Sequence, residues 1–363
     1  DKEAVLLFTS GSSGDPKGVV LTHKNLLANI NQFSSRLNLS RTDRVLGCLP
    51  LFHSFGCTVT TWFPLIEGYT TVTYPSPVES SRLAGLIEKY RVTLVLGTPT
   101  FLRGYLRKAK PEQFAAVKLV VAGAEKLPPS MAESFQDKLG IEIMEGYGLT
   151  ETSPVSNVNI PDPTPDADPN IPIIPALRRG SVGQLLPGVA ARITDPDTDM
   201  PLPLHQSGMI WLRGPNIFTG YLNQPTKSAE VLQGRWFKTG DIGRLDEDGF
   251  LYIEGRLSRF SKIGGEMVPH ETVETYLSNA LRLDQDDERK LVVMGVPDAA
   301  KGEALVLLTI DPNLEFDALR KHLIGEGVPV LWVPRKYKVI DVIPILASGK
   351  LDLKACQDLA LQA

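Results

Sequence analysis

Between Thr70 and Glu145 the sequence alternates short β-prone runs with amphipathic helical segments, and this alternation constrains the fold more than any other feature. The segments are, in order, Thr70–Tyr74 as strand, Ser81–Tyr90 as helix, Val92–Leu96 as strand, Pro99–Leu106 as helix, Leu119–Ala122 as strand, Pro129–Leu139 as helix and Ile141–Glu145 as strand. Such alternation predicts an α/β fold with a doubly wound, mostly parallel sheet. Ligands of such sheets bind beyond the carboxyl ends of the strands.

The periodicity changes twice further along the chain. Pro161–Pro175 is rich in proline and aspartate, which predicts an exposed, extended loop. From Gly180 to about Ile253, short apolar runs separated by turn residues predict a small β-rich unit. The remainder predicts a compact α+β domain, with helices at His270–Asn279 and Phe316–Glu326 and strands at Lys290–Val296, Ala304–Ile310 and Tyr337–Val342. We therefore expect an α/β core at residues 1–179, a β-rich subdomain at 180–256 and an α+β C-terminal domain at 257–363.

Charge and cysteine content exclude some classes of function. Lysine and arginine number 38 against 42 aspartates and glutamates, so the chain lacks the basic excess that bulk nucleic-acid binding requires. The three cysteines (Cys48, Cys57 and Cys356) form no CxxC pair, which is typical of a reducing compartment. Cys48, His53 and Cys57 lie close in sequence, but their apolar surroundings favour buried thiols over a zinc site.

The 22 residues of Val45–Ile66 carry no formal charge, so their length would permit a membrane span. Pro50, His53 and Pro64 interrupt the stretch, which favours a buried strand, loop and helix instead. The chain begins almost directly on the β-prone run Ala4–Thr9 and shows no signal-peptide pattern. We therefore expect no membrane span in this chain, and a sequence that is part of a longer polypeptide.

The strongest chemical signal is the run Thr9-Ser10-Gly11-Ser12-Ser13-Gly14-Asp15-Pro16-Lys17-Gly18. Hydroxyls, glycine backbone N–H groups and a lysine after a strand are suited to wrapping phosphate oxygens. The run is not a Walker A loop, because Lys17 precedes Gly18 and is followed by Val19. A flexible linker is the alternative, but a linker is not expected between a core strand and the apolar run Val19-Val20-Leu21.

The order of the motifs resembles that of the adenylate-forming enzymes: acyl-CoA and acyl-carrier-protein synthetases, luciferases and the adenylation domains of peptide synthetases. The resemblance is carried by Thr9–Gly18, Tyr147-Gly148-Leu149-Thr150-Glu151, Thr239-Gly240-Asp241, Gly255-Arg256 and Ser348-Gly349-Lys350. In that family, motifs in this order bind ATP and Mg²⁺ and activate a carboxylic acid. The resemblance therefore implies an ATP-dependent acid–thiol ligase.

Longer stretches resemble more narrowly the synthetase half of the bacterial bifunctional 2-acylglycerophosphoethanolamine acyltransferase/acyl-ACP synthetases. They are Leu49–Gly56, Val121–Leu127, Gly214–Ile217 and Lys301–Leu307. This similarity runs nearly from end to end, while the family's upstream part has no counterpart here. It implies a truncated protein whose full-length form is cytoplasmic, or lies on the cytoplasmic face of the inner membrane and associates with it through the upstream region.

The resemblance assigns a role to each matching residue. Thr9, Ser10, Gly11, Ser12, Ser13, Gly14 and Lys17 would hold the β- and γ-phosphates of ATP. Thr150 would bond the α-phosphate, and Glu151 would bind Mg²⁺. Gly123, Ala124 and Glu125 would border the adenine, on which Tyr147 would stack, and Asp241 and Arg256 would bind the ribose. Lys350 would bridge the attacking carboxylate and the α-phosphate, and His53 would line the acyl entrance.

Residue chemistry alone leaves an ordinary alternative for several of these positions. Thr150-Glu151 is also typical of a helix N-cap with an acidic first turn. Asp241 is compatible with a turn, Arg256 with a surface salt bridge, Tyr147 and His53 with core positions, and Lys350 with an ordinary exposed lysine. One position departs from the family, since Ser258 stands where many relatives carry a hinge aspartate.

The acceptor of the acyl group stays open at this point. No cysteine matches a family nucleophile, so the resemblance implies a phosphopantetheine thiol, carried by acyl carrier protein or by CoA. Arg320, Lys321, Arg335, Lys336 and Lys338 would supply a basic face for a carrier protein, although solvated surface is the simpler interpretation. A third hypothesis is a fragment that binds nucleotide but does not turn over, because its upstream part is absent.

Overall fold

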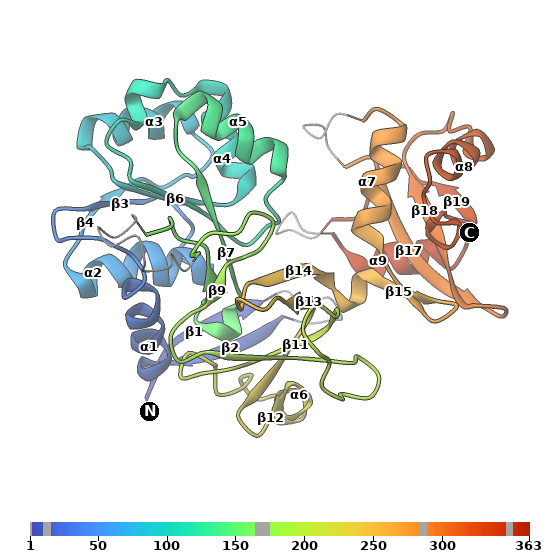
Figure 1. Cartoon of the computed structure of the whole chain (residues 1–363), viewed down its shortest axis with the longest axis horizontal. Helices are drawn as coiled ribbons and strands as arrows, with labels where there is room; N and C mark the ends of the chain where they lie inside the picture. The colour runs from blue at the N-terminus through green and yellow to red at the C-terminus, as the bar shows by residue number, and fades with distance from the viewer. Residues whose placement is uncertain (1, 10–15, 164–174, 284–288, 346–350) are drawn as a thin grey trace, which may run out of the picture. The chain divides into compact units, whose positions relative to one another are not determined.

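The computed structural model describes residues 2–9, 16–163, 175–283, 289–345 and 351–363 (Figure 1). They form two compact units. The first comprises the residues up to Thr9, Pro16–Thr239 and Gly243–Ile253, and the second includes Gly240–Ile242 and Glu254–Ala363. Among the described residues, no helix combines the length and the apolar character needed to cross a bilayer. The three-domain division expected from the sequence stays a prediction.

A seven-stranded sheet organises the first unit, with the strand order β4-β3-β5-β6-β7-β8-β9. Strands β4 to β7 run parallel, whereas β8 and β9 pair antiparallel at one edge. The strands and their connections are β3 (Arg44–Gly47), the π-helix η1 (Phe55–Trp62), α2 (Phe63–Glu67), β4 (Thr70–Thr73), α3 (Ser80–Tyr90), β5 (Leu94–Gly97), α4 (Pro99–Lys108), the 3₁₀ turn η2 (Pro111–Phe114), β6 (Leu119–Ala122), α5 (Pro129–Leu139), β7 (Ile143–Gly148), the 3₁₀ turn η3 (Thr150–Thr152), β8 (Val155–Val158) and β9 (Gln184–Leu185).

Helices cover both faces of this sheet (Figure 1). On one face, α3, α4 and α5 bury residues such as Ile87, Leu102 and Phe135 against the strands. On the other face, η1, α2 and α1 (His23–Ser34) bury a second core that includes Phe33 and Phe63. Successive strand residues alternate between the two cores, as the period of two in a strand requires. The predicted doubly wound α/β sheet is confirmed.

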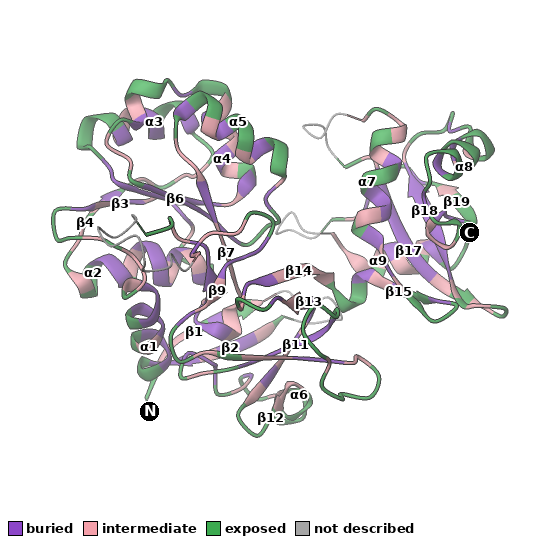
Figure 2. Ribbon diagram, in the orientation of Figure 1, coloured by how far each residue is buried: buried purple, intermediate pink, exposed green. Residues whose placement is uncertain are grey.

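The rest of the first unit is β-rich. Strands β1 (Glu3–Thr9) and β2 (Lys17–Thr22) form an antiparallel pair of their own. A five-stranded sheet has the path β10-β11-β13-β12, with β14 paired to β13. Its elements are β10 (Ala190–Thr194), β11 (Gly208–Arg213), α6 (Pro225–Val231), β12 (Leu232–Gln233), β13 (Trp236–Leu245) and β14 (Leu251–Arg256). The expected core strand at Ala4–Thr9 therefore lies outside the large sheet, and its Leu6 and Phe8 are exposed. In the large sheet, by contrast, β6 is buried along its whole length (Figure 2).

The second unit is an α+β domain, as the sequence predicts. A sheet with the path β16-β15-β18-β17 carries β19 beside β18. Helices α7 and α8 pack on one face, and α9 on the other. The elements are the 3₁₀ turn η4 (Leu257–Arg259), β15 (Phe260–Ile263), β16 (Glu266–Pro269), α7 (His270–Ala280), β17 (Leu291–Asp298), β18 (Gly302–Thr309), α8 (Phe316–Gly325), the 3₁₀ turn η5 (Val330–Trp332), β19 (Lys336–Val339) and α9 (Leu353–Ala360).

The expected loop at Pro161–Pro175 falls largely outside the described residues. Its first residues, 161–163, are exposed and lack regular structure. The uncharged stretch Val45–Ile66 forms the strand, loop and helix that its composition predicts, with the helix starting as a π-helix. Gly56 makes this turn possible, because a Cβ there would lie 2.1 Å from the Pro50 carbonyl oxygen.

Candidate active site

Predicted site residues of the first unit follow three of its parallel strands. His53 follows β3, Gly123 follows β6, and Thr150 and Glu151 follow β7. Because β3, β6 and β7 are parallel, their carboxyl ends lie at the same edge of the sheet. The edge at which α/β proteins bind ligands therefore carries residues predicted independently from sequence motifs.

Hydrogen bonds of buried polar groups hold the turn that carries Thr150. The backbone N–H of Leu149 donates to the Thr152 hydroxyl at 2.9 Å. Asn216 donates from Nδ2 to the Thr152 carbonyl at 2.9 Å, and its own carbonyl accepts from the Ser153 hydroxyl at 2.8 Å. Thr152, Ser153 and Asn216 are fully buried, whereas Thr150 remains half-exposed. The Thr150 hydroxyl lies 3.4 Å from that of Ser54, so the loop after β3 borders the same turn.

Glu151 meets a residue that the sequence analysis did not select. The Tyr221 hydroxyl donates to Glu151 Oε1 at 2.9 Å, and the Phe218 N–H donates to the Glu151 carbonyl at the same distance. The Lys17 ammonium lies 5.1 Å from the centroid of the Tyr221 ring. The structure thus brings Lys17 of the phosphate-loop motif and Glu151 of the Thr-Glu motif to two ends of one tyrosine.

Glu151 has a carboxylate oxygen that suits a magnesium ion. Among the residues that the structure describes, no hydrogen bond reaches its Oε2 oxygen. Mg²⁺ prefers carboxylate and phosphate oxygens and is commonly held by only one or two carboxylates together with the substrate phosphates. The free oxygen of Glu151 therefore fits the predicted ion.

The phosphate-loop motif is described only at its two ends. Thr9 and Lys17 face each other as a pair of the β1–β2 ladder, so the two described ends of the motif lie next to each other. The remaining candidates of this motif lie outside the described residues: Ser10, Gly11, Ser12, Ser13 and Gly14. Gly18 is needed for close packing, because a Cβ there would lie 3.1 Å from Leu6 Cδ1 and 3.2 Å from Leu222 Cβ.

The predicted adenine edge forms a tight loop after β6. A Cβ on Gly123 would touch the Phe55 ring at 3.4 Å, and Ala124 has a left-handed backbone with φ of 69°. A non-glycine residue in that region costs free energy, which is typical of functional loops. The Glu125 carboxylate accepts hydrogen bonds from the backbone N–H and the hydroxyl of Thr100, at 3.2 and 2.7 Å. Glu125 thereby ties the loop to the start of α4.

Tyr147 contacts the hydrophobic core, as one of the two interpretations left open by the sequence requires. Its side chain is half-buried and packs against the core of the β-rich region. Base stacking by its exposed part stays a prediction.

Glu145 is a half-buried carboxyl group beside this loop that the sequence analysis did not select. Burial raises its pKa to about 7, while the backbone N–H of Leu127 donates to it at 3.3 Å and nearby Lys126 opposes the rise. Since β7 carries both Glu145 and Tyr147, the strand fastens the loop through a group that titrates near neutral pH.

The predicted ribose pair lies in the second unit. Asp241 is only 3% exposed, and its Oδ1 accepts from Arg256 Nε at 2.8 Å. The two motifs that contain them, 15 residues apart in sequence, therefore meet as an ion pair on the neighbouring strands β13 and β14. The Arg256 side chain is 52% exposed, which leaves it accessible to a ligand.

His53 is exposed, so the alternative of a buried core histidine is wrong. Its Nδ1 accepts from the Phe55 N–H at 3.3 Å.

Burial raises the pKa of the Cys48 thiol to about 11 and that of Cys57 above its usual value. Within the described ranges, no cluster of three His, Cys, Asp or Glu side chains is arranged to hold a metal ion.

Lys350 lies outside the described residues. The nearest described residues on the two sides, Ile345 and Leu351, form an antiparallel bridge.

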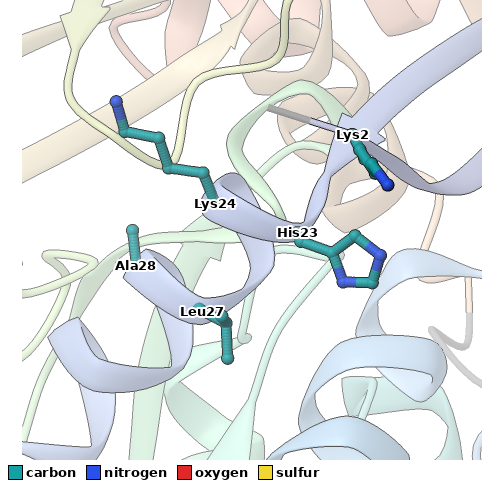
Figure 3. A pocket seen from close by; sticks show the side chains of 5 residues that line it. All are labelled: Lys2, His23, Lys24, Leu27 and Ala28. Carbon is teal, nitrogen blue, oxygen red and sulfur yellow. The ribbon is translucent and has the colours of Figure 1, made fainter.

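An open hollow at the beginning of α1 contains no predicted site residue (Figure 3). Its lining consists of Lys2, His23, Lys24, Leu27 and Ala28. The candidate site is therefore defined by converging polar groups and not by this hollow.

Sequence reasoning missed Ser54, Glu145 and Tyr221. Ser54 lies inside the Leu49–Gly56 motif and could have been selected as a hydroxyl beside His53. Tyr221 lies 70 residues from Glu151 in sequence, and no local pattern indicates their contact.

Comparison with known proteins identifies the family of the chain. Residues 1–222 match the family described as AMP-binding enzyme. A long-chain-fatty-acid–CoA ligase from Bacillus subtilis is 31% identical over 357 residues, which cover 96% of this chain and 60% of the relative. A feruloyl-CoA synthase from Amycolatopsis is 29% identical, with coverage of 97% and 68%. The chain thus spans about three fifths of the length of the first of these relatives.

Several solved structures are similar to this chain in fold. o-Succinylbenzoate coenzyme A synthetase from Bacillus subtilis in complex with AMP superposes with a TM-score of 0.80 at 27% identity, covering 98% of this chain and 69% of that one. ATP-bound MatB from Rhodopseudomonas palustris gives a TM-score of 0.79 at 27% identity, with coverage of 98% and 68%. Since the family match alone spans more than half of the sequence, the chain belongs to the AMP-binding enzyme family.

Proposed function

We propose that this chain activates a fatty acid with ATP and then passes the acyl group to a phosphopantetheine thiol. In the first step a carboxylate oxygen attacks the α-phosphorus of ATP, and the bond to pyrophosphate breaks. In the second step the thiol sulfur attacks the acyl carbon, AMP leaves, and the thiol proton passes to solvent. The observation that carries the proposal is the convergence of Lys17 and Glu151 on Tyr221, with Thr150 beside them.

The first step needs positive charge and hydrogen-bond donors, because two anions must approach each other. Lys17 supplies a compact ammonium at the end of the phosphate loop, and the half-exposed Thr150 hydroxyl supplies a donor for the α-phosphate. Glu151 would hold Mg²⁺, which when bound neutralises phosphate charge. Lys350 would neutralise the attacking carboxylate together with the α-phosphate.

Recognition of the nucleoside is assigned to two further groups. The buried carboxylate of Asp241 would accept hydrogen bonds from ribose hydroxyls, with Arg256 as an added donor. The Gly123–Glu125 loop would border the base, because its missing Cβ and left-handed turn leave backbone groups at its edge. Tyr147 would stack on the base with the part of its ring that is not packed in the core.

The acceptor divides the proposal into two forms. The narrow sequence resemblance favours acyl carrier protein, feeding lysophospholipid reacylation, whereas the matched relatives are CoA ligases and favour CoA. The stack of Phe316 on Tyr337, at 4.6 Å between ring centroids, holds α8 beside β19 and so gathers the basic residues of both elements. Part of that charge is engaged internally: Arg335 pairs with Asp298 at 3.0 Å, and Lys338 bonds Gln362. This engagement weakens the case for a basic docking face for a carrier protein.

In the thioester step, the loop Gly264-Gly265-Glu266 would approach the acyl-AMP, as the family resemblance implies. Gly264 and Gly265 have φ values of 60° and 91° and join β15 to β16 in a two-residue turn. Two glycines adopt such angles in succession without strain, and without side chains they can present their backbone closely to a ligand. Ser258 would act in the hinge that precedes this region.

A pyrophosphate-release assay with a panel of fatty acids tests the proposal, with holo-acyl carrier protein and CoA compared as acceptors. We expect pyrophosphate release that depends on both ATP and fatty acid. The Lys350→Ala variant should lose acyl-AMP formation at least about 100-fold while still converting supplied acyl-AMP to thioester. Equal loss of both steps would contradict the role of Lys350. ATP binding without pyrophosphate release would leave only the alternative of nucleotide binding without turnover.

A further inference from the structure

Backbone hydrogen bonds and ring packing hold Tyr221 in place. The backbone around it pairs with β2, since the Leu222 N–H donates to the Gly18 carbonyl at 2.8 Å. Its own N–H donates to the Ser228 hydroxyl at 2.8 Å, and its ring packs against Phe218 with 5.0 Å between centroids. The residue is 8% exposed. Both the position and the direction of the side chain are therefore fixed by contacts outside the candidate site.

The two ends of this side chain act on two charged groups. The hydroxyl donates to Glu151 Oε1, which directs the carboxylate and leaves Oε2 for another partner. The ring face carries the negative part of the aromatic quadrupole, and the Lys17 ammonium lies over it at 5.1 Å. Lys17 and Glu151 thus stay close to each other without neutralising each other in a direct salt bridge.

We propose that Tyr221 is a positioning residue for the magnesium–triphosphate part of the substrate. Through its hydroxyl it orients the metal-binding oxygen of Glu151, and through its ring it holds Lys17 toward the phosphates. This inference rests on the proposed function, which does not itself require any role for Tyr221. A buried tyrosine with a purely structural role would stabilise the fold but would leave the Mg²⁺ dependence unchanged.

The variant Tyr221→Phe removes the hydroxyl and keeps the ring. The matched control is Tyr74→Phe, because the Tyr74 hydroxyl also donates to a glutamate carboxylate, Glu79 Oε2, at 2.7 Å. The measurement is ATP binding by calorimetry over a series of Mg²⁺ concentrations, together with pyrophosphate release over the same series. We expect the half-saturating Mg²⁺ concentration to rise about 5–10-fold in Tyr221→Phe and to stay unchanged in Tyr74→Phe.

An unchanged Mg²⁺ dependence in Tyr221→Phe, or the same shift in both variants, would overturn the inference. Its failure differs from that of the proposed function, in which the unmodified protein itself releases no pyrophosphate with any acid tested.

A second variant separates the ring from the hydroxyl. Tyr221→Leu should shift the Mg²⁺ dependence as Tyr221→Phe does, and should in addition weaken ATP binding in the absence of Mg²⁺, because Lys17 loses its aromatic support. If Tyr221→Leu binds metal-free ATP as tightly as Tyr221→Phe, the role of the ring is wrong. Should Tyr221→Leu fail to fold, the phenylalanine variant still decides the role of the hydroxyl.

Discussion

Glu151 in the first unit and Glu274 in the second are both held by hydrogen bonds, but their two oxygens are used differently. Glu274 Oε1 accepts from Arg259 and from the Val293 N–H, and Oε2 accepts from Arg289 Nη1 at 3.0 Å. Glu151 Oε1 accepts from Tyr221, and no described residue donates to its Oε2. Glu274 is 7% exposed, whereas Glu151 lies half-exposed at a strand end. A carboxylate with both oxygens satisfied fixes a fold, and one with an open oxygen can take a ligand.

The buried network of the second unit has a clear mechanical consequence. Arg259 follows directly after Ser258, the position of the expected hinge, and it is 4% exposed. Its contacts with Glu274 on α7 and with the Val293 carbonyl on β17 fasten the chain immediately after that position. If Ser258 acts as the expected hinge, the changes in backbone angles would fall at or before Ser258.

The largest expected change in stability comes from removing Glu274, the carboxylate whose two oxygens both accept hydrogen bonds. Glu274→Ala leaves Arg259 buried without its counter-charge, which should lower the free energy of unfolding by about 3–5 kcal/mol. Urea denaturation measures this loss. Glu271→Ala, an exposed position of the same helix, is the control and should change stability by less than about 0.5 kcal/mol. Equal stability of the two variants would show that the network around Glu274 does not hold the domain together.

Removing the charge of Glu151 should lower activity and leave stability almost unchanged. Glu151→Gln keeps an acceptor for Tyr221 but removes the charge that would bind Mg²⁺, so pyrophosphate release should fall about 100-fold. The unfolding free energy should change by less than about 0.5 kcal/mol, because the side chain is half-exposed. Glu79→Gln, in the remote Tyr74 pair, should retain activity. A large stability loss in Glu151→Gln would move this residue into the same class as Glu274.

A third carboxylate, Glu145, sharpens the comparison because no ion pair with it is found in the described structure and its pKa is raised to about 7 from an ordinary 4.5. The folded state thus keeps a proton that the unfolded chain releases above pH 4.5. Stability should fall by up to about 3 kcal/mol as the pH rises from about 4.5 to 7, and then level off. Glu145→Gln keeps an acceptor for the Leu127 N–H and should flatten this decline in thermal unfolding measured at pH 5 and pH 8. Persistence of the full decline in that variant would assign it to other groups.

The fold was predictable wherever apolar periodicity was strong. The strand β6 and the helix α5 begin and end at the predicted residues, since β6 is a continuous apolar run and α5 is bounded by Pro129 and Gly140. Strand β8 was not expected, because two of its central residues, Ser156 and Asn157, are polar and yet fully buried. Their side chains bond each other and the Gly183 carbonyl, a compensation that sequence alone does not reveal. Helix α9 was also missed, since it buries only small residues, Cys356 and Ala360.

The candidate site was predictable as a set of motifs but not as a set of contacts. The order of the motifs indicated Lys17, Glu151 and Asp241, but the meeting of Lys17 and Glu151 at Tyr221 depends on three segments far apart in the chain. Such contacts arise from the packing of β2 against the residues before α6. The roles assigned to these residues stay predictions until variants are measured.

The burial of the sulfur atoms makes the protein suitable for fluorescence studies without prior removal of its cysteines. The pKa of both Cys48 and Cys356 is raised to about 11, and that of Cys57 is also raised, so little thiolate exists near pH 7. Cysteines introduced at exposed positions such as Lys89 and Glu326 should therefore react first with maleimide dyes. A donor and acceptor pair placed there would report the distance between the two units during the proposed reaction.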